Sequence, residues 1–385
     1  MKVLFAANRS YALWSSRRFL IRLLLRAGYE VEIATTIDEY SDRLVDMGVR
    51  RHELVVDRGG GSLLSNARLF WRLFSIYRRT CPDVLQHFHA KPVILGTLAS
   101  RWAGVKVTVN TITGLGSSLP EGGVSGWLAK LLYRLACRLS SVTVFQNKDD
   151  RRLFEQRNIL SGCRSIVILS SGVDTSRFLP DDRSEPSSFR VLFMARLLWD
   201  KGVQEFAEAA QILTEQLGDV VSFELAGEID HGNHRALSEA DLERMGADYP
   251  VDCVHYIERP EAWMRGAAVF VCPSYYREGV PRVVLEAASC GLPVVGCDVA
   301  GTREAIQDGA TGFIVPPRDP KALAAAIMRL YENPDLRHTM GQSARRLMLD
   351  KFDVMAISER YKALYMKLYE ELPEADRHTE IESRK

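Results

Sequence analysis

Two glutamates near residue 280 are the side chains whose type and spacing most favour chemistry. Glu278 and Glu286 lie eight residues apart in REGVPRVVLEAASCG, with a Gly-Val-Pro turn between them. In an unbroken helix they would stand about 80° apart, but the turn lets each carboxylate reach a ligand separately. A carboxylate just before a helix can hold sugar hydroxyls, and one deeper in the helix can hold a ribose. Either glutamate alone could equally be a solvated or capping side chain.

Two cations form a second candidate group. Arg196 and Lys201 lie in RLLWDKG, which follows the apolar run RVLFMA and opens a predicted helix. A helix start has unpaired N–H groups and a favourable dipole, so two cations there suit a diphosphate. Solvated loop residues are the simpler alternative. The chain has no GxxxxGK[ST] loop, which excludes a Walker-type site. It also has no DxD triplet, of which EID at 228–230 is the nearest approach, so neither a metal nor a cofactor is predicted.

The elements that must position these turns occur in two similar halves. Apolar runs at 2–7 and 189–195 are each followed by a helical pattern and another strand, which predicts parallel sheets with right-handed crossovers. The expected fold is α/β, with two doubly wound domains at 1–180 and 181–372 and a flexible polar tail at 373–385. The polar, proline-containing stretch 179–189 marks the seam. Ligands of such folds bind at the carboxyl ends of strands, in the crevice.

Composition and charge limit the class of protein and the kinds of partner that it could bind. The chain is 46% hydrophobic and 26% charged, and it shows neither a membrane-spanning run nor a signal-peptide pattern at its start. Its seven cysteines form no CxxC pair, which is typical of reduced cytosolic thiols. Residues 1–180 carry 26 Lys and Arg against 14 Asp and Glu, whereas residues 181–385 carry 24 against 35. This asymmetry is either a difference between two solvated surfaces or a sign that the basic half faces an anionic membrane or a phosphorylated acceptor. No recognisable nucleic-acid module accompanies the basic residues.

The stretch 124–139, VSGWLAKLLYRLACRL, predicts an amphipathic helix. Large apolar residues gather on one side: Trp127, Leu128, Leu131, Leu132 and Leu135. Lys130, Arg134 and Arg138 follow at four-residue steps on another side. A helix packed in the core is the simpler interpretation, and a helix lying on an anionic membrane is the alternative.

The combination of motifs resembles the large retaining glycosyltransferase family of GT-B fold, glycosyltransferase family 4 or group 1. RLLWDKG, the two spaced glutamates, GLPVV, GTREAI and DGATGFIVPPRDPKALAAAI carry the resemblance over about 163–370. NTITGLG, FQNKDDRRLF and SSGVDTSRF in the first half look like the branch that acts on undecaprenyl-diphosphate-linked acceptors. The family implies two Rossmann-like domains facing across a cleft, with C-terminal helices packing back toward the first.

The resemblance implies roles for individual donor-site residues. Arg196 and Lys201 would bind the nucleotide diphosphate, and with Glu278, which holds donor-sugar hydroxyls, they make up the expected catalytic set. Glu286 would hold the ribose. The other implied donor contacts are Gly227, Glu258 for the base, Gly279 and Val280 for the diphosphate, and Pro281.

The first half of the sequence departs from the family pattern at two loops. ANRSYALWSS stands where many members have a glycine pair, and NTITGLG replaces a histidine-containing loop. Asn110 and Thr113 would stand in for that histidine, and Lys91 would hold acceptor phosphates. His87 and His89 share one face of a strand, but no third metal ligand is near, so they are expected to be packed or to face the acceptor.

The implied reaction is metal-independent, retaining transfer of an N-acetylhexosamine-type sugar from a UDP-sugar to a polyprenyl-diphosphate-linked sugar. It would serve capsule, lipopolysaccharide or related polysaccharide biosynthesis at the inner face of the cytoplasmic membrane. The leaving phosphate itself would take the proton of the attacking hydroxyl. A sugar-nucleotide epimerase on the same fold, a transferase with a soluble acceptor and a non-catalytic binding protein are the alternatives.

Overall fold

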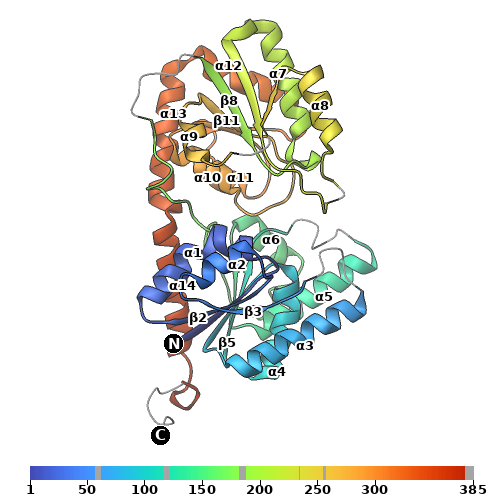
Figure 1. The fold of residues 1–385 in the computed structure, drawn as a ribbon, viewed down its shortest axis with the longest axis vertical. Coiled ribbons are helices and arrows are strands. Elements are labelled where there is room, and N and C mark those ends of the chain that lie inside the picture. Colours follow the sequence, from blue (N-terminus) through green and yellow to red (C-terminus); the bar gives the residue numbers. More distant parts are fainter. Residues whose placement is uncertain are drawn as a thin grey trace. The chain divides into compact units, whose positions relative to one another are not determined.

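Parallel strands alternate with helices in two units, each with its own sheet. The computed structural model describes residues 1–56, 62–115, 119, 122–181, 188–233, 235–254 and 257–377. One unit comprises residues 1–171 and 355–385, and the other comprises residues 172–354 (Figure 1). The proposed seam at 179–189 lies partly outside the described residues. The first unit includes the last long helix, whereas the sequence-based division kept that helix with the second domain.

The first unit has a seven-stranded parallel sheet of order β3-β2-β1-β4-β5-β6-β7. Its strands are β1 (Lys2–Ala6), β2 (Glu30–Thr35), β3 (Arg50–Glu53), β4 (Val84–Phe88), β5 (Val107–Ile112), β6 (Val142–Phe145) and β7 (Ser165–Val167). Its helices are α1 (Ser10–Arg26), α2 (Glu39–Val45), α3 (Leu63–Thr80), α4 (Thr97–Ala103), α5 (Gly123–Leu139), α6 (Lys148–Gln156) and α14 (Val354–Glu370), with a π-turn at Pro92–Gly96.

Helix α14 belongs to the first unit because it completes that unit's core. Tyr361 and Tyr365 are fully buried with Val3 and Phe5 of β1 in one cluster. The Tyr365 hydroxyl donates to Gln86 Oε1 in β4 at 2.9 Å. The chain past α14 continues as a short turn at Glu374–Asp376, where Lys106 pairs with Asp376 at 2.7 Å. The rest of the predicted tail, 378–385, lies outside the described residues.

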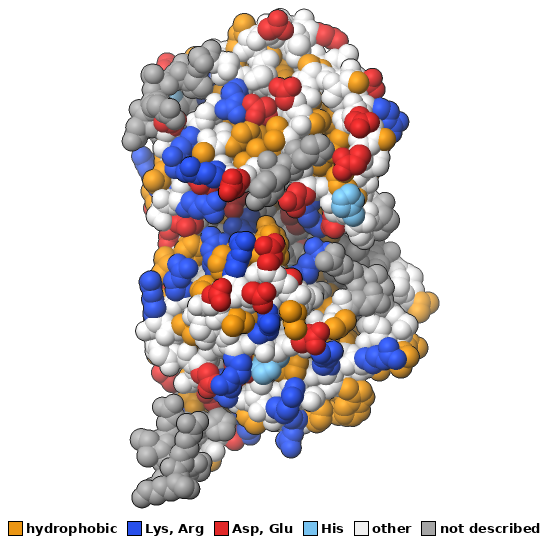
Figure 2. Space-filling model, in the orientation of Figure 1, with side chains coloured by type: hydrophobic (Ala, Val, Ile, Leu, Met, Phe, Trp, Pro, Cys, Tyr) orange, Lys and Arg blue, Asp and Glu red, His pale blue; other side chains and the backbone are white. Residues whose placement is uncertain are grey.

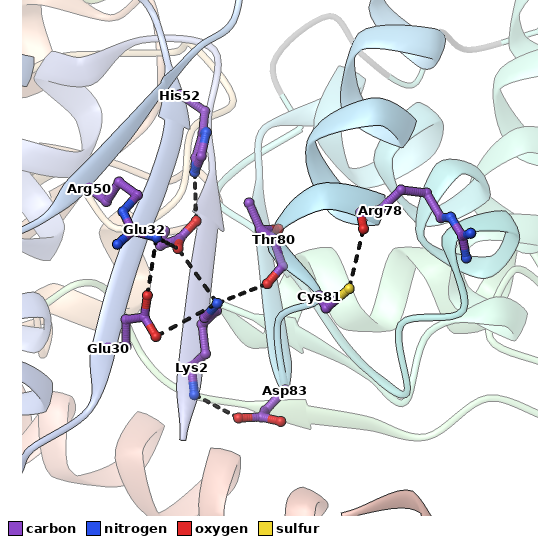
Figure 3. Close-up of polar contacts among 9 residues, drawn as sticks. All are labelled: Lys2, Glu30, Glu32, Arg50, His52, Arg78, Thr80, Cys81 and Asp83. Carbon is purple, nitrogen blue, oxygen red and sulfur yellow. Dashed lines mark hydrogen bonds and ion pairs between the residues drawn. The ribbon is translucent and has the colours of Figure 1, made fainter. Parts of the chain in front are cut away.

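A network of charges ties β1, β2 and β3 together (Figure 3). The Glu32 side chain is fully buried and lies 2.6 Å from His52 Nε2, 3.2 Å from Arg50 and 3.8 Å from Lys2. Burial alone would raise the pKa of Glu32, but the hydrogen bond from His52 and the nearby cations outweigh it and lower that pKa. The network therefore favours an ionised glutamate between the three strands.

Helix α5 corrects the simpler expectation of a core-packed apolar side. Its inward residues are Gly126, Tyr133, Ala136 and Cys137. Of the large apolar residues that the sequence placed on one side, four are exposed: Trp127, Leu128, Leu131 and Leu135. Three of these inward residues are small, Tyr133 packs edge to face on Phe154 with ring centres 5.3 Å apart, and the apolar stripe is left on the surface.

The second unit has a six-stranded parallel sheet of order β10-β9-β8-β11-β12-β13. Its strands are β8 (Phe189–Met194), β9 (Val221–Ala226), β10 (Asp252–Val254), β11 (Val269–Cys272), β12 (Val294–Cys297) and β13 (Gly312–Val315). Its helices are α7 (Val203–Leu217), α8 (Glu239–Asp248), α9 (Pro260–Arg265), α10 (Arg282–Ser289), α11 (Thr302–Ala305), α12 (Pro320–Glu332) and α13 (Pro334–Leu347). Both sheets are thus parallel and doubly wound, as the strand–helix alternation predicts.

Candidate functional site

The centre of the second sheet is where its winding reverses. The chain leaves β8 toward β9 on one side, while β11, which pairs with β8, leads to β12 on the other. The loops that follow β8 and β11 diverge from this point, and such a switch point is the usual ligand-binding position of an open parallel sheet. The candidate residues at 196–201 and 278–281 come from these two loops.

Lys201 and Glu278, 77 residues apart in the sequence, form an ion pair there. The lysine side chain is 8% exposed and that of the glutamate 26%. Lys201 Nζ also lies 5.4 Å from the ring centre of Tyr276, close enough for a cation–π contact. The structure therefore brings together two of the three residues that the sequence proposed as catalytic.

Backbone contacts fix the turn that carries Lys201. The carbonyl of Asp200 accepts hydrogen bonds from the N–H groups of Tyr275 and Tyr276, both at 3.1 Å. Gly202 follows with φ of 81°, and a Cβ at this position would lie 2.7 Å from the carbonyl carbon of Pro273. Only glycine accommodates both the left-handed backbone and this approach, so the two loops are locked against each other.

A second glycine, absent from the sequence-based candidates, supports Glu278. Gly301 has φ of 86°, and a Cβ there would lie 2.6 Å from the carbonyl carbon of Gly279 and 3.1 Å from Glu278 O. The loop after β12 therefore rests directly on the backbone at 278–279. Gly301 belongs to GTREAI, which contributed to the family resemblance, but nothing in the sequence indicates what it contacts.

Glu286 lies in α10, the helix that follows the loop with Glu278. It is 8% exposed and accepts a hydrogen bond from Arg282 one turn earlier, at 2.9 Å. Pro281 is the residue immediately before the helix, and Val280 is buried. The turn does separate the two glutamates: Glu278 is in the loop and Glu286 is in the helix.

The remaining donor-site candidates are spread along the carboxyl edge of the sheet. Arg196 is half exposed and bonds Asp230 at 3.0 Å, so it is held by the acid of the EID triplet rather than by the Lys201 pair. Gly227 directly follows β9, and a Cβ there would lie 3.0 Å from the carbonyl carbon of Ala195. Glu258 is exposed in a bend after β10. Among the described residues, Glu258 forms no ion pair or hydrogen bond with Lys201 or Glu278.

The first unit presents its candidates at the end of β4 and in β5. Lys91 and Thr113 are partly exposed in segments that follow these strands. Asn110 is fully buried within β5, where its Oδ1 lies 2.9 Å from His87 Nδ1 and accepts from Thr97 at 3.0 Å. Asn110 is a sequence-based candidate because its amide could stand in for the family's histidine. The structure places that amide in a hydrogen-bond network inside the fold.

The two histidines have different surroundings. His87 is buried in β4, its Nε2 lies 3.0 Å from the Tyr77 hydroxyl, and burial lowers its pKa to about 4. Because Asn110 Oδ1 can only accept, Nδ1 of His87 carries the proton and Nε2 accepts from Tyr77. His89 follows the strand with φ of 67° and accepts from the backbone N–H of Asn8 at 3.3 Å. Burial, and then the charges of nearby arginines, lowers its pKa to about 4.

The described residues contain neither a metal-binding cluster nor a membrane-spanning helix. No group of three or more His, Cys, Asp or Glu side chains within them is placed to hold a metal ion. Among their helices, none combines the length and the hydropathy that a membrane crossing requires.

Family models match both units. Residues 178–347 match the model described as "Glycosyl transferases group 1", and residues 16–162 match the "Glycosyl transferase 4-like domain". The first match contains the Lys201–Glu278 pair, Gly301 and Glu286.

Two similar curated proteins cover most of the chain. One is the N,N'-diacetylbacillosaminyl-diphospho-undecaprenol alpha-1,3-N-acetylgalactosaminyltransferase of Campylobacter jejuni, 28% identical over 95% of this chain and 98% of the relative. Another is the UDP-Gal:alpha-D-GlcNAc-diphosphoundecaprenol alpha-1,3-galactosyltransferase of Escherichia coli, 23% identical over 80% of this chain and 81% of the relative.

Solved glycosyltransferase structures share the fold. Anabaena Alr3699/HepE, solved in complex with UDP and glucose, superimposes with a TM-score of 0.75 at 20% identity, covering 95% of this chain and all of that one. A glycosyltransferase from Rickettsia africae gives a TM-score of 0.78 at 16% identity, over 96% and 99% of the two chains. At these identities the likeness concerns the GT-B architecture.

Proposed function

Because the chain belongs to the group 1 glycosyl transferases with a GT-B fold, we propose that it transfers a sugar from a UDP-sugar to a lipid-diphosphate-linked sugar with retention of configuration. Glycosyltransferase activity itself follows from the family. The observation that carries the finer proposal is the Lys201–Glu278 pair at the switch point of the second sheet.

The second unit would bind the donor. Lys201 would contact the diphosphate, near the start of α7, and Glu278 would turn its carboxylate to the sugar hydroxyls. Glu286, one and a half turns into α10, would hold the ribose. This assignment is supported by the depth of Lys201, because a cation that is mostly removed from water interacts more strongly with a phosphate than a solvated one.

The chemistry we propose is dissociation of the sugar–diphosphate bond with attack on the same face. Negative charge grows on the departing diphosphate, where Lys201 and Arg196 supply fixed positive charge without a metal. The departing phosphate oxygen takes the proton of the attacking hydroxyl, so the carboxylate of Glu278 is not needed as a general base. The spacing rules for paired carboxylates in glycosidases do not apply.

The first unit would bind the acceptor, with Lys91 and Thr113 as candidate contacts in the segments that follow β4 and β5. An N-acetylhexosamine-type donor is supported by the name of the C. jejuni relative, an N-acetylgalactosaminyltransferase, whereas the E. coli relative is named for transfer of galactose from UDP-Gal. An undecaprenyl-diphosphate-linked acceptor is supported by both names. Such an acceptor would bring the enzyme to the inner face of the cytoplasmic membrane, and the basic exposed helix α5 supports the proposal of peripheral contact with anionic lipids.

The test measures donor binding and transfer separately. UDP-, GDP- and ADP-sugars are first screened by thermal shift, where a selectively bound donor raises the melting temperature by mass action. The selected donor is then incubated with and without a polyprenyl-diphosphate-linked sugar. We expect a UDP-sugar to stabilise the protein and its sugar to reach the lipid-linked acceptor in the α configuration that retention requires when the donor is α-linked.

A charge variant sharpens the test. Lys201→Met should lower kcat/KM on the order of 10²- to 10³-fold, the usual effect of removing one donor that stabilises transition-state charge. Lys321→Met, which changes an exposed lysine on α12, is the control. Conversion of the donor without acceptor would instead indicate an epimerase, and unchanged turnover in Lys201→Met would refute the proposed donor site.

A further inference from the structure

The outer face of α5 is apolar rather than polar. Trp127 is 64% exposed, Leu128 and Leu131 are each 47% exposed, and Leu135 is 40% exposed. At 100° per residue these four side chains form one stripe along the helix, with Lys130, Arg134 and Arg138 along its flank. A surface helix normally buries such a stripe, so its exposure calls for an explanation.

A second apolar feature lies on α3 and α4. Trp71 and Trp102 have ring centres 6.2 Å apart, and Phe70 lies 5.3 Å from Trp102. The two tryptophans stack edge to face with these neighbours, yet Trp71 remains 56% exposed and Trp102 64% exposed. The cluster is therefore held in a fixed geometry while it presents two large amphipathic rings to the surface.

The charge on these helices has one sign. The segments α3, α4 and α5 together contain eight arginines and lysines and no aspartate or glutamate. Arg68 and Arg78 stand three residues before and seven after Trp71, on the same exposed side of α3, and Arg101 precedes Trp102. Within the described part of the chain, these three arginines form no ion pair. The surface is thus both apolar and strongly cationic.

The three helices form one surface. Helix α3 packs against α4, and α4 packs against α5. Figure 1 shows the three side by side on one side of the first sheet, away from α1 and α14. In Figure 2 the corresponding part of the first unit carries hydrophobic side chains with Lys and Arg between them. We call α3, α4 and α5 with these side chains the three-helix surface.

We propose that the three-helix surface docks on an anionic phospholipid bilayer, with Trp71, Trp102 and the α5 stripe in the headgroup layer. Tryptophan rings favour that layer, and the basic residues pair with anionic headgroups. None of the three helices carries a carboxylate, although Glu53 of β3 pairs with Arg72 at 2.7 Å, and this excess of positive charge fits a negatively charged partner that extends over all three helices. The choice of a bilayer rests on the proposed function, because a lipid-linked acceptor is presented at a membrane. Trp71 on α3 and Trp102 on α4 would define how the first unit lies on the bilayer.

The test is flotation with vesicles that contain no lipid-linked acceptor. Vesicles of phosphatidylglycerol and phosphatidylcholine in equal parts are compared with pure phosphatidylcholine. We expect the wild-type protein to float with the anionic vesicles, and to float less at high salt because screening weakens the attraction. Trp71→Ser/Trp102→Ser should lower the partition constant by at least about tenfold, because two large apolar rings no longer leave water when the protein binds.

A second variant leaves the aromatic cluster intact. Arg68→Gln/Arg101→Gln should lower the partition constant about 30-fold, since each basic residue near an anionic surface contributes about 1 kcal/mol. The control is Val220→Ser/Leu349→Ser, which changes two comparably exposed apolar residues of the second unit, 51% and 47% exposed. We expect the control to float like wild type, and all variants to keep the UDP-sugar thermal shift.

The outcomes separate this inference from the proposed function. If wild type does not float while it transfers sugar, or if both surface variants float like wild type, the docking surface is refuted and the transferase assignment stands. If wild type floats but binds no nucleotide sugar, the proposed function fails instead. If sedimentation without lipid shows a dimer that Trp71→Ser/Trp102→Ser dissociates, a second copy covers the surface and the bilayer proposal is overturned.

Discussion

Replacing Gly301 by alanine tests how the donor site is supported. The new Cβ would lie 2.6 Å from the carbonyl carbon of Gly279, and backbone atoms cannot rotate out of the way as a side chain could. Carbon atoms in contact favour about 3.5–4.0 Å, so the loops at 278–279 and 301 must separate by about 1 Å. That movement would shift Glu278 relative to Lys201. A misplacement of about 1 Å in a catalytic group can cost on the order of 10²-fold in rate.

The matched control is Gly309→Ala. Gly309 also has a positive φ, 74°, but a Cβ there meets nothing within 4 Å. Both variants place alanine at a positive φ, which costs about 1–2 kcal/mol in the left-handed helical region and more at Gly301, where ψ is −45°. The melting temperature of both should therefore fall, and that of Gly301→Ala should fall further. Only Gly301→Ala should also lower kcat/KM for the UDP-sugar, on the order of 10²-fold. Equal kinetics in the two variants would refute the proposed role of the loop contact.

Three further changes have expected outcomes. Glu286→Gln should raise the KM for the donor about tenfold with little change in kcat, because a ribose contact is made equally in ground and transition states; steady-state kinetics checks this. His87 has a pKa of about 4 in the folded state against 6.5 in the unfolded chain, so unfolding takes up a proton between these values and stability falls on acidification from pH 6.5 to 4. The loss should reach about 3 kcal/mol, and His87→Gln should remove it in hydrogen exchange of the β4 amides. Glu32 has a lowered pKa, so its contribution is present above pH 4.5 and is lost as the pH falls through the folded value. Urea unfolding of Glu32→Gln should show a flatter acid limb than wild type.

The sequence by itself determined the features that depend on local order. The spacing of apolar residues indicates alternating strands and helices. This alternation predicts two parallel doubly wound sheets, and the structure contains both. The loops at Lys201 and Glu278 could be identified because each follows an apolar run and precedes a helix. The separation of Glu278 in the loop from Glu286 in the helix follows from the Gly-Val-Pro turn.

Tertiary structure decided which distant residues meet. Lys201 and Glu278 pair only because β8 and β11 are neighbours in the sheet, and Gly301 supports Glu278 only because the loop after β12 crosses there. The sequence cannot tell whether the amide of Asn110 faces a ligand or the protein interior. Its position within β5 buries it, where it bonds His87. Periodicity found the large apolar side of α5 but could not say which side packs inward, because the side with Gly126, Tyr133 and Ala136 is also apolar enough to be buried. Contact between elements far apart in the chain makes that choice, and the pattern within one element does not contain it.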